Sequence, residues 1–195
     1  MAIESLLLIL GGYLLGSIPA AYLAGRWTKG LDVRRYGSGT VGGSMVWEHV
    51  ARWAVVPVGL FDIGKAALPV WLGLQLGLGM PVSAAAGLAA VAGHNWPIFL
   101  HFTGGRGLAC FLGLLLVVFP WGFPWLLAFL TIGFLLGDSA PFALAGLVTL
   151  PLLGHLVGGP EIVTPLAAAM LLLTLAKRLE ANRRPLPAPG KDRLG

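Results

Sequence analysis

Seven apolar segments fill most of this chain, and their length restricts it to folds that span a membrane. Charged residues and clusters of glycine and proline separate them, at residues 4–24, 52–76, 81–100, 108–119, 123–137, 140–158 and 162–176. Hydrophobic residues make up 57% of the chain and charged residues 11%, whereas a soluble domain has about 25% charged residues. About 20 apolar residues in a helix cross the hydrocarbon of a bilayer. We therefore expect an all-α integral membrane protein with about seven transmembrane helices.

The fourth and fifth segments are shorter than the others. Residues 108–119 and 123–137 meet at the proline and glycine cluster 120–124. Each is shorter than the length that a straight crossing needs. The pair can be two tilted or broken helices, or one re-entrant hairpin.

The basic residues predict the orientation of the chain. They lie between the first and second segments (residues 26–52), between the third and fourth (Arg106), and after the seventh (residues 177–184). All of these places fall on one side, and cytoplasmic loops are enriched in Lys and Arg. We expect the N-terminus outside and the C-terminus in the cytoplasm. The excess of cations in these predicted cytoplasmic loops explains the net charge of +5. We therefore expect no nucleic-acid partner.

The chain reads as one domain. No polar stretch is long enough to enclose a soluble core, so we assign residues 1–184 to a single transmembrane domain. Residues 185–195 contain three prolines, which cannot continue a helix. We expect this segment to be an extended cytoplasmic tail.

A glycine loop with one cation lies between the third and fourth segments. Its sequence is Gly104-Gly105-Arg106-Gly107. Glycines let backbone N–H groups approach an anion closely, and arginine presents several donors that suit phosphate. At a membrane surface this loop predicts a site for a phosphorylated substrate.

A second glycine-rich loop precedes the second segment. Arg35, Gly37, Ser38, Gly39 and Thr40 combine a cation, two hydroxyls and flexible backbone within six residues. This combination is suited to binding phosphate oxygens. The alternative is a pliable connector whose arginines serve only topology.

Three ionisable residues lie within or beside the apolar segments. Asp62 and Lys65 are three residues apart on one helix face and can pair. Such residues either serve a functional site or form a structural ion pair. His94 lies close before the glycine loop and can bind phosphate or move a proton, or it can be a structural histidine. The four histidines are far apart and there is one cysteine, so we expect no metal site.

Five short motifs occur together in order along the chain. They are Gly16-Ser17-Ile18-Pro19, Arg34-Arg35-Tyr36-Gly37-Ser38-Gly39, Asp62-Ile63-Gly64-Lys65, Gly93-His94-Asn95-Trp96-Pro97 and Phe102-Thr103-Gly104-Gly105-Arg106-Gly107. In these motifs the chain resembles the bacterial PlsY-type acylphosphate:glycerol-3-phosphate acyltransferases. The resemblance implies a multi-pass enzyme of the bacterial inner membrane. It implies acyl phosphate and glycerol 3-phosphate as substrates, lysophosphatidate as product, and no cofactor.

The same resemblance implies roles for individual residues. Ser38, His94 and Arg106 are the expected catalytic residues, with Arg106 where the family usually has lysine. The expected substrate-binding residues are Arg35, Gly37, Gly39, Thr40, Gly104, Gly105, Gly107 and Asn182.

Four positions depart from the family pattern. Thr40 and Met45 replace asparagines, Glu48 replaces an arginine, and Leu179 replaces a histidine. A carboxylate at position 48 repels phosphate, and leucine cannot transfer a proton. These departures keep open an alternative, a catalytically silent relative that binds glycerol phosphate or an anionic lipid. A small transporter is a third class, but the sequence has no repeated halves that would favour it.

Overall fold

The computed structural model describes residues 2–183, with side chains to residue 180, and all regular structure in that part is helical. The longer helices are α1 (Ala2–Gly16), α2 (Ala20–Lys29), α4 (Val55–Gln75), α5 (Gly79–Asn95), α6 (Leu108–Val118), α7 (Gly122–Leu135), α8 (Ser139–Leu156) and α9 (Val163–Arg183). Short helical turns connect some of them: η1 (Val33–Arg35), α3 (Gly43–Met45), the π-helix η2 (Val46–Val50), η3 (Arg52–Ala54) and η4 (Ile98–Leu100).

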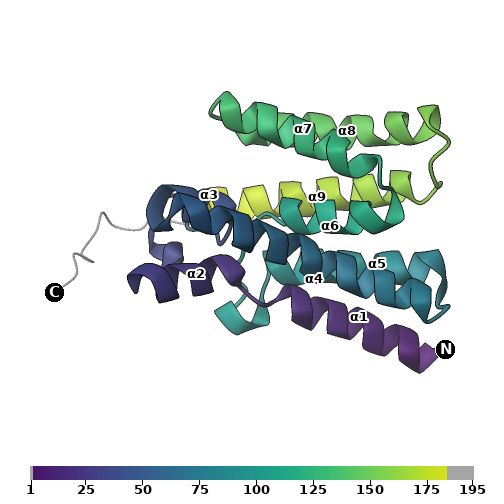
Figure 1. The fold of residues 1–195 in the computed structure, drawn as a ribbon, viewed down its shortest axis with the longest axis horizontal. Helices are drawn as coiled ribbons and strands as arrows, with labels where there is room; N and C mark the ends of the chain where they lie inside the picture. The colour runs from purple at the N-terminus through teal and green to yellow at the C-terminus, as the bar shows by residue number, and fades with distance from the viewer. Residues whose placement is uncertain (1, 184–195) are drawn as a thin grey trace.

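The long helices lie side by side along one direction (Figure 1). The N-terminus and the α4–α5 and α8–α9 connections lie at one end of the bundle. The opposite end carries α2, the turns before α4, and the last turns of α9. We call this second end the loop end, defined by residues 30–54, 96–107 and 136–138.

The prediction of an all-helical chain with long apolar helices is confirmed. Within residues 2–183, three helical stretches are long and apolar enough to cross a membrane: Ala2–Lys29, Arg52–Gln75 and Ser139–Leu156. Two further apolar helices are shorter, namely α6 and α7. Many large apolar side chains on the outside of the bundle are exposed, as lipid-facing residues are.

The first apolar segment contains two helices rather than one. α1 ends at Gly16 and α2 starts at Ala20. Pro19 has no backbone N–H and cannot continue the α1 hydrogen-bond pattern. The backbone N–H and the hydroxyl of Ser17 both donate to the carbonyl of Tyr13, at 2.9 and 2.8 Å, where α1 ends.

Glycines bring α1 and α5 into backbone contact. A side chain on Gly12 or Gly16 would overlap the carbonyl groups of Ala86 or Ala90 on α5. Gly93 of α5 meets the α1 backbone in the same way. Small residues at a helix interface let two backbones approach, which stabilises helix pairs in lipid. This contact fixes the position of the end of α5, where His94 lies.

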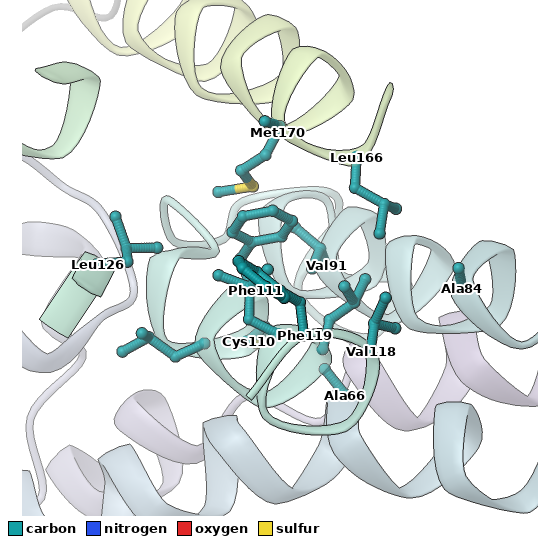
Figure 2. Close-up of a cluster of buried hydrophobic side chains, with 14 of the residues drawn as sticks. Ala66, Ala84, Val91, Cys110, Phe111, Val118, Phe119, Leu126, Leu166 and Met170 are labelled. Atoms are coloured by element: carbon teal, nitrogen blue, oxygen red, sulfur yellow. The ribbon is translucent and has the colours of Figure 1, made fainter. Parts of the chain in front are cut away.

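Helix α6 forms the centre of the apolar core. Phe111, Leu114 and Leu115 are fully buried, and they contact residues of α4, α5 and α9. Figure 2 shows Phe111, Phe119 and Val118 grouped below Met170 of α9. With 11 residues α6 is about 16 Å long, whereas its neighbour α4, with 21 residues, is about 32 Å long. At the loop end, α6 starts further inside the bundle than the first turn of α4 (Figure 1).

Candidate active site

A cavity of about 690 Å³ opens at the loop end. Its walls come from the second glycine-rich loop and the turns after it, from Arg106, from the start of α8, and from α9. Ser38, Thr40 and Ser44 supply hydroxyls on one side. The cavity therefore gathers residues that are up to 140 positions apart in the sequence, from Ser38 to Arg178.

The two glycine loops are joined directly beside this cavity. The backbone N–H of Val41 donates to the carbonyl of Gly104 at 3.1 Å. The N–H of Gly105 in turn donates to the carbonyl of His94 at 3.1 Å. A Cβ on Gly104 would overlap the His94 carbonyl, and a Cβ on Gly105 would overlap the His94 ring. Only glycine allows this junction between the two loops and α5.

Gly107 immediately precedes α6 and adopts a backbone conformation that favours glycine. Its φ is 75°, in the left-handed region that side chains disfavour. A Cβ at this position would lie 2.5 Å from the side-chain oxygen of Asn95. Asn95 is fully buried, and neither its side-chain oxygen nor its nitrogen has a hydrogen-bond partner among the described residues. The start of α6 is thus packed tightly over a buried amide.

Two positive φ values shape the other loop. Gly37 has a φ of 50° and Gly39 a φ of 67°. Between them lies Ser38, whose hydroxyl is 2.8 Å from the hydroxyl of Thr40. Both hydroxyls belong to residues that line the cavity. The turn therefore presents a pair of hydroxyls suited to an oxyanion.

Arg106 is the cation at the start of α6, and it also lines the cavity. Its guanidinium donates to the hydroxyl of Ser44 at 3.5 Å. Burial lowers the pKa of Arg106, while the negative charges of Asp138 and Glu48 oppose that shift. An arginine stays protonated near neutral pH. It is a partly desolvated positive charge, which interacts more strongly with an anion than a charge in water does.

Asp62, Lys65 and His94 form a buried network next to the loop junction. Lys65 Nζ lies 2.8 Å from Asp62 Oδ1 and 3.0 Å from His94 Nδ1. It also donates to the carbonyl of Ile18 at 3.0 Å, in the break between α1 and α2. His94 and Lys65 line a separate small cavity of about 10 Å³ with Ser17 and Gly104. His94 therefore does not line the larger cavity, and it contacts the glycine loop from the side of α5.

The network contains a set of possible metal ligands. Ligand atoms of Asp62, His94 and Cys110 lie within 4.8 Å of one another. The ammonium group of Lys65 contacts both Asp62 and His94, so two of the three possible ligands already have a cationic partner. The donor set fits a lysine better than a metal.

Some predicted residues lie outside the cavity. Arg35 is exposed and is not among the residues that line it. Leu179, at the position of the family's histidine, is 59% exposed and does not line it either. Asn182 is in the last turn of α9, but its side chain is outside the described part, as is the predicted tail 185–195.

Other residues line the cavity that the sequence did not single out. Thr174 and Lys177 of α9 are both buried, and Arg178 follows them. Asp138 caps α8 by accepting from the N–H of Ala140 at 2.9 Å. Lys177 counts in the sequence only as a topogenic cation, because no local motif indicates that a lysine near a helix end turns inward. Its spacing from Thr174, one helical turn, was the available signal.

Known proteins resemble this chain over almost its whole length. A family model described as glycerol-3-phosphate acyltransferase matches residues 6–186. Glycerol-3-phosphate acyltransferase 4 of Dehalococcoides mccartyi is 40% identical over 185 residues, covering 90% of this chain and 78% of the relative. A glycerol-3-phosphate acyltransferase of Synechococcus sp. is 38% identical over 196 residues, covering 100% of this chain and 98% of the relative.

Two solved structures have the same fold. One is PlsY, an integral membrane glycerol 3-phosphate acyltransferase, in its glycerol 3-phosphate form, with a TM-score of 0.81 and 30% identity. The other is its lysophosphatidic acid form, with a TM-score of 0.79 and 29% identity. Each comparison covers 92% of this chain and 91% of the solved chain. The resemblance inferred from the five motifs is confirmed, and this chain belongs to the glycerol-3-phosphate acyltransferase family of integral membrane proteins.

Proposed function

We propose that this protein transfers a fatty acyl group from an acyl phosphate to glycerol 3-phosphate. The hydroxyl oxygen of glycerol 3-phosphate bonds to the acyl carbon, and the bond from that carbon to the phosphate oxygen breaks. The products are lysophosphatidate and hydrogen phosphate, which carries away the hydroxyl proton in the overall balance. The reaction needs no cofactor, because the acyl phosphate already has a good leaving group.

The observation that carries this proposal is the junction of two glycine loops beside one cavity. The bond between Val41 and Gly104 joins the loops, and the cavity next to them contains hydroxyls and the Arg106 guanidinium. Two phosphorylated reactants must be held together, and their developing negative charge must be stabilised. A preorganised cationic loop beside paired hydroxyls supplies both requirements.

Ser38, Thr40 and Arg106 bind and orient the phosphate groups in this proposal. Gly37 and Gly39 shape the turn that carries the hydroxyls. Arg35 in the loop before α3 and Asn182 in the last turn of α9 are further substrate-binding residues. The absence of side chains at Gly104, Gly105 and Gly107 lets the loops approach each other closely. Apolar cavity residues receive the start of the acyl chain, namely Leu108, Phe134, Ala143 and Leu144.

His94 is proposed to act on the site through the glycine loop. Its carbonyl accepts from Gly105, and its ring lies against Gly105. The Asp62–Lys65 pair holds the Nδ1 side of that ring. These contacts support positioning of the loop, and direct proton transfer by His94 stays a prediction from the sequence.

The proposed topology has about seven crossings, with the N-terminus outside and the C-terminus in the cytoplasm of a bacterial inner membrane. The basic residues of the loop end support this orientation, because cytoplasmic loops are enriched in cations. The short α6 and α7 are separate helices on either side of residues 119–121, which supports counting them as two. Residues 1–184 form the one domain, with 185–195 as its tail.

The four departures from the family pattern leave the core of the proposed site in place. The Thr40 hydroxyl pairs with Ser38, and Met45 is buried beside that pair. Glu48 is about half exposed at the cavity, and its Oε2 lies 3.6 Å from His49 Nε2. The family match and the retained loop junction favour the enzyme over a silent binding relative.

Product formation by the purified protein tests the proposal. Detergent-solubilised protein is incubated with acyl phosphate and radiolabelled glycerol 3-phosphate, and the lipid extract is separated by chromatography. We expect labelled lysophosphatidate that depends on both substrates. The absence of product above a boiled-protein control would contradict the enzyme and leave the silent binding relative.

A further inference from the structure

Lys177 of α9 is a buried lysine at the wall of the larger cavity. Its side chain is 2% exposed, and it lines the cavity together with Thr174 and Arg178. Burying an ammonium group is costly unless partners compensate. A lysine that served only membrane topology would not need to be buried, so its burial indicates a further role.

Two neighbours fix the position of Lys177. Its Nζ lies 3.0 Å from Glu180 Oε2 and 5.2 Å from the centre of the Trp96 ring. The same carboxylate oxygen accepts from Trp96 Nε1 at 2.8 Å. Glu180 and Trp96 therefore tie the last turns of α9 to the end of α5, and they hold the ammonium group at the cavity.

Thr174 lies one turn before Lys177, and its hydroxyl is unusual in this protein. The hydroxyls of Thr28, Thr131 and Thr149 each donate to the carbonyl four residues earlier, at 2.6–2.8 Å. The hydroxyl of Thr174 is buried and has no hydrogen-bond partner among the described residues. A buried hydroxyl without a partner costs free energy. A ligand in the cavity would satisfy it.

We propose that Thr174 and Lys177 form a second oxyanion site, on the α9 wall of the cavity, which takes a phosphate group of one of the two reactants. This inference rests on the proposed function, in which two phosphate groups share one cavity. Ser38, Thr40 and Arg106 hold one of them, and α9 holds the other. Two carboxylates, Glu48 and Asp138, also line the cavity, so Arg106 alone would leave the cavity with a net negative charge before any substrate enters.

The site also explains how the chain tolerates Glu48. The family pattern places an arginine there, and its loss removes a cation from the cavity. Arg178 supplies a cation from a different element, and Lys177 brings an ammonium group that is paired with Glu180. The α9 wall thus contributes cationic side chains to the cavity in which Glu48 lies.

Equilibrium binding to the full-length protein in detergent tests whether the loops and α9 hold different phosphate groups, and it does not require turnover. Two probes are titrated separately by calorimetry: glycerol 3-phosphate, and a non-hydrolysable acyl phosphonate in place of the acyl phosphate. The variants are Lys177→Gln and the nearly isosteric Thr174→Val. Lys29→Gln is the matched control, because it removes one exposed cation from the same end of the molecule.

We expect both α9 variants to weaken the same one of the two probes, Lys177→Gln by about tenfold or more and Thr174→Val by about threefold or more. Arg106→Ala should weaken the other probe. Lys29→Gln should stay within about twofold of the parent for both. Should Lys177→Gln fail to fold, Lys177→Arg with retained affinity and Thr174→Val with reduced affinity would carry the same conclusion.

Unchanged binding of both probes by Thr174→Val and by either folded Lys177 variant would overturn the site. So would equal weakening of both probes by the α9 and Arg106 variants, or a parent that binds neither probe. Failure of acyl transfer is a separate result. A parent that binds both probes but forms no lysophosphatidate would contradict the proposed enzyme while the binding data still decide on the α9 site.

Discussion

The backbone N–H of Val41 donates a hydrogen bond of 3.1 Å to the carbonyl of Gly104. These residues lie on the two glycine loops, more than sixty positions apart. Neither side chain takes part, so the contact depends on how closely the two backbones approach. The closeness comes from Gly104 and Gly105, where any side chain would overlap His94.

The first prediction concerns this contact. Gly104→Ala should separate the loops, abolish acyl transfer, and lower the free energy of unfolding by about 1–3 kcal/mol, because the added methyl group overlaps backbone atoms. Gly59→Ala is the control, since nothing lies within 4 Å of a methyl group there. It should stabilise α4 by up to about 1 kcal/mol. Activity assays and thermal unfolding measure both, and a fully active Gly104→Ala protein would refute the role of the junction.

The second prediction concerns the charge at position 106. Arg106→Ala should reduce kcat/KM by about 100-fold or more, while Arg106→Lys should keep much of the activity, because the positive charge is the required property. Arg26→Ala removes an exposed arginine, which bonds Tyr22 and Gly30 away from the cavity, and should leave the rate unchanged. Equal rates for Arg106→Ala and the parent would contradict the assignment.

The third prediction concerns the buried ion pair. Lys65→Met should destabilise the protein by about 3–5 kcal/mol, because it leaves the Asp62 carboxylate buried without its cation. Combining it with Asp62→Asn should recover part of that loss. Thermal unfolding of both single variants and the double variant gives the coupling energy. Additive effects would mean that the two residues stabilise the protein independently.

The fourth prediction concerns Glu48, whose carboxylate faces the cavity and is about half exposed. Glu48→Gln should lower the KM for glycerol 3-phosphate about two- to fivefold at low salt with little change in kcat, because one repulsive charge disappears in a solvated setting. Steady-state kinetics at two salt concentrations measure this. A raised KM would show that the carboxylate helps binding.

The fifth prediction concerns the ion pair of Asp32 and Arg34 before α3, in which Asp32 Oδ2 lies 2.6 Å from Arg34 Nη2. Burial raises the pKa of Asp32, but its hydrogen bonds and charge interaction with Arg34 outweigh this and leave the pKa below its usual value. A lowered carboxyl pKa adds stability above the unfolded pKa of about 3.9, and that stability is lost as the pH falls through the folded pKa. The parent should therefore exceed Asp32→Asn in Tm at pH 5–7 and lose that advantage in more acidic buffer. A difference independent of pH would rule out the charged pair as its source.

Much of the fold follows from the sequence, because apolar runs and glycine or proline breaks determine where membrane helices start and stop. The helices α4 to α9 lie close to the segments read from hydropathy. The break at Pro19 and the π-helix η2 were not predicted. Pro19 lies inside an apolar run, and a π-helix depends on local packing rather than on composition.

The site was predictable only where the residues are local in sequence. The glycine loops can be recognised by their composition. Asp62 and Lys65 can be recognised by their helical spacing. Thr174 and Lys177 have the same helical spacing, but spacing alone does not show that they face inward, because that depends on how α9 rotates against α5. His94 was expected among the reacting groups, but its place behind Gly105 follows from the contact between α1 and α5.

The shortness of α6 has a consequence for where chemistry happens. A water-soluble reactant and a lipid-soluble reactant must meet at one level of the protein, and the loop before α6 provides the cation at that level. α6 starts further from the loop end than α4 does (Figure 1), so the loop before it carries Arg106 toward the apolar core. The fatty carbonyl can then react without being drawn out of the bilayer.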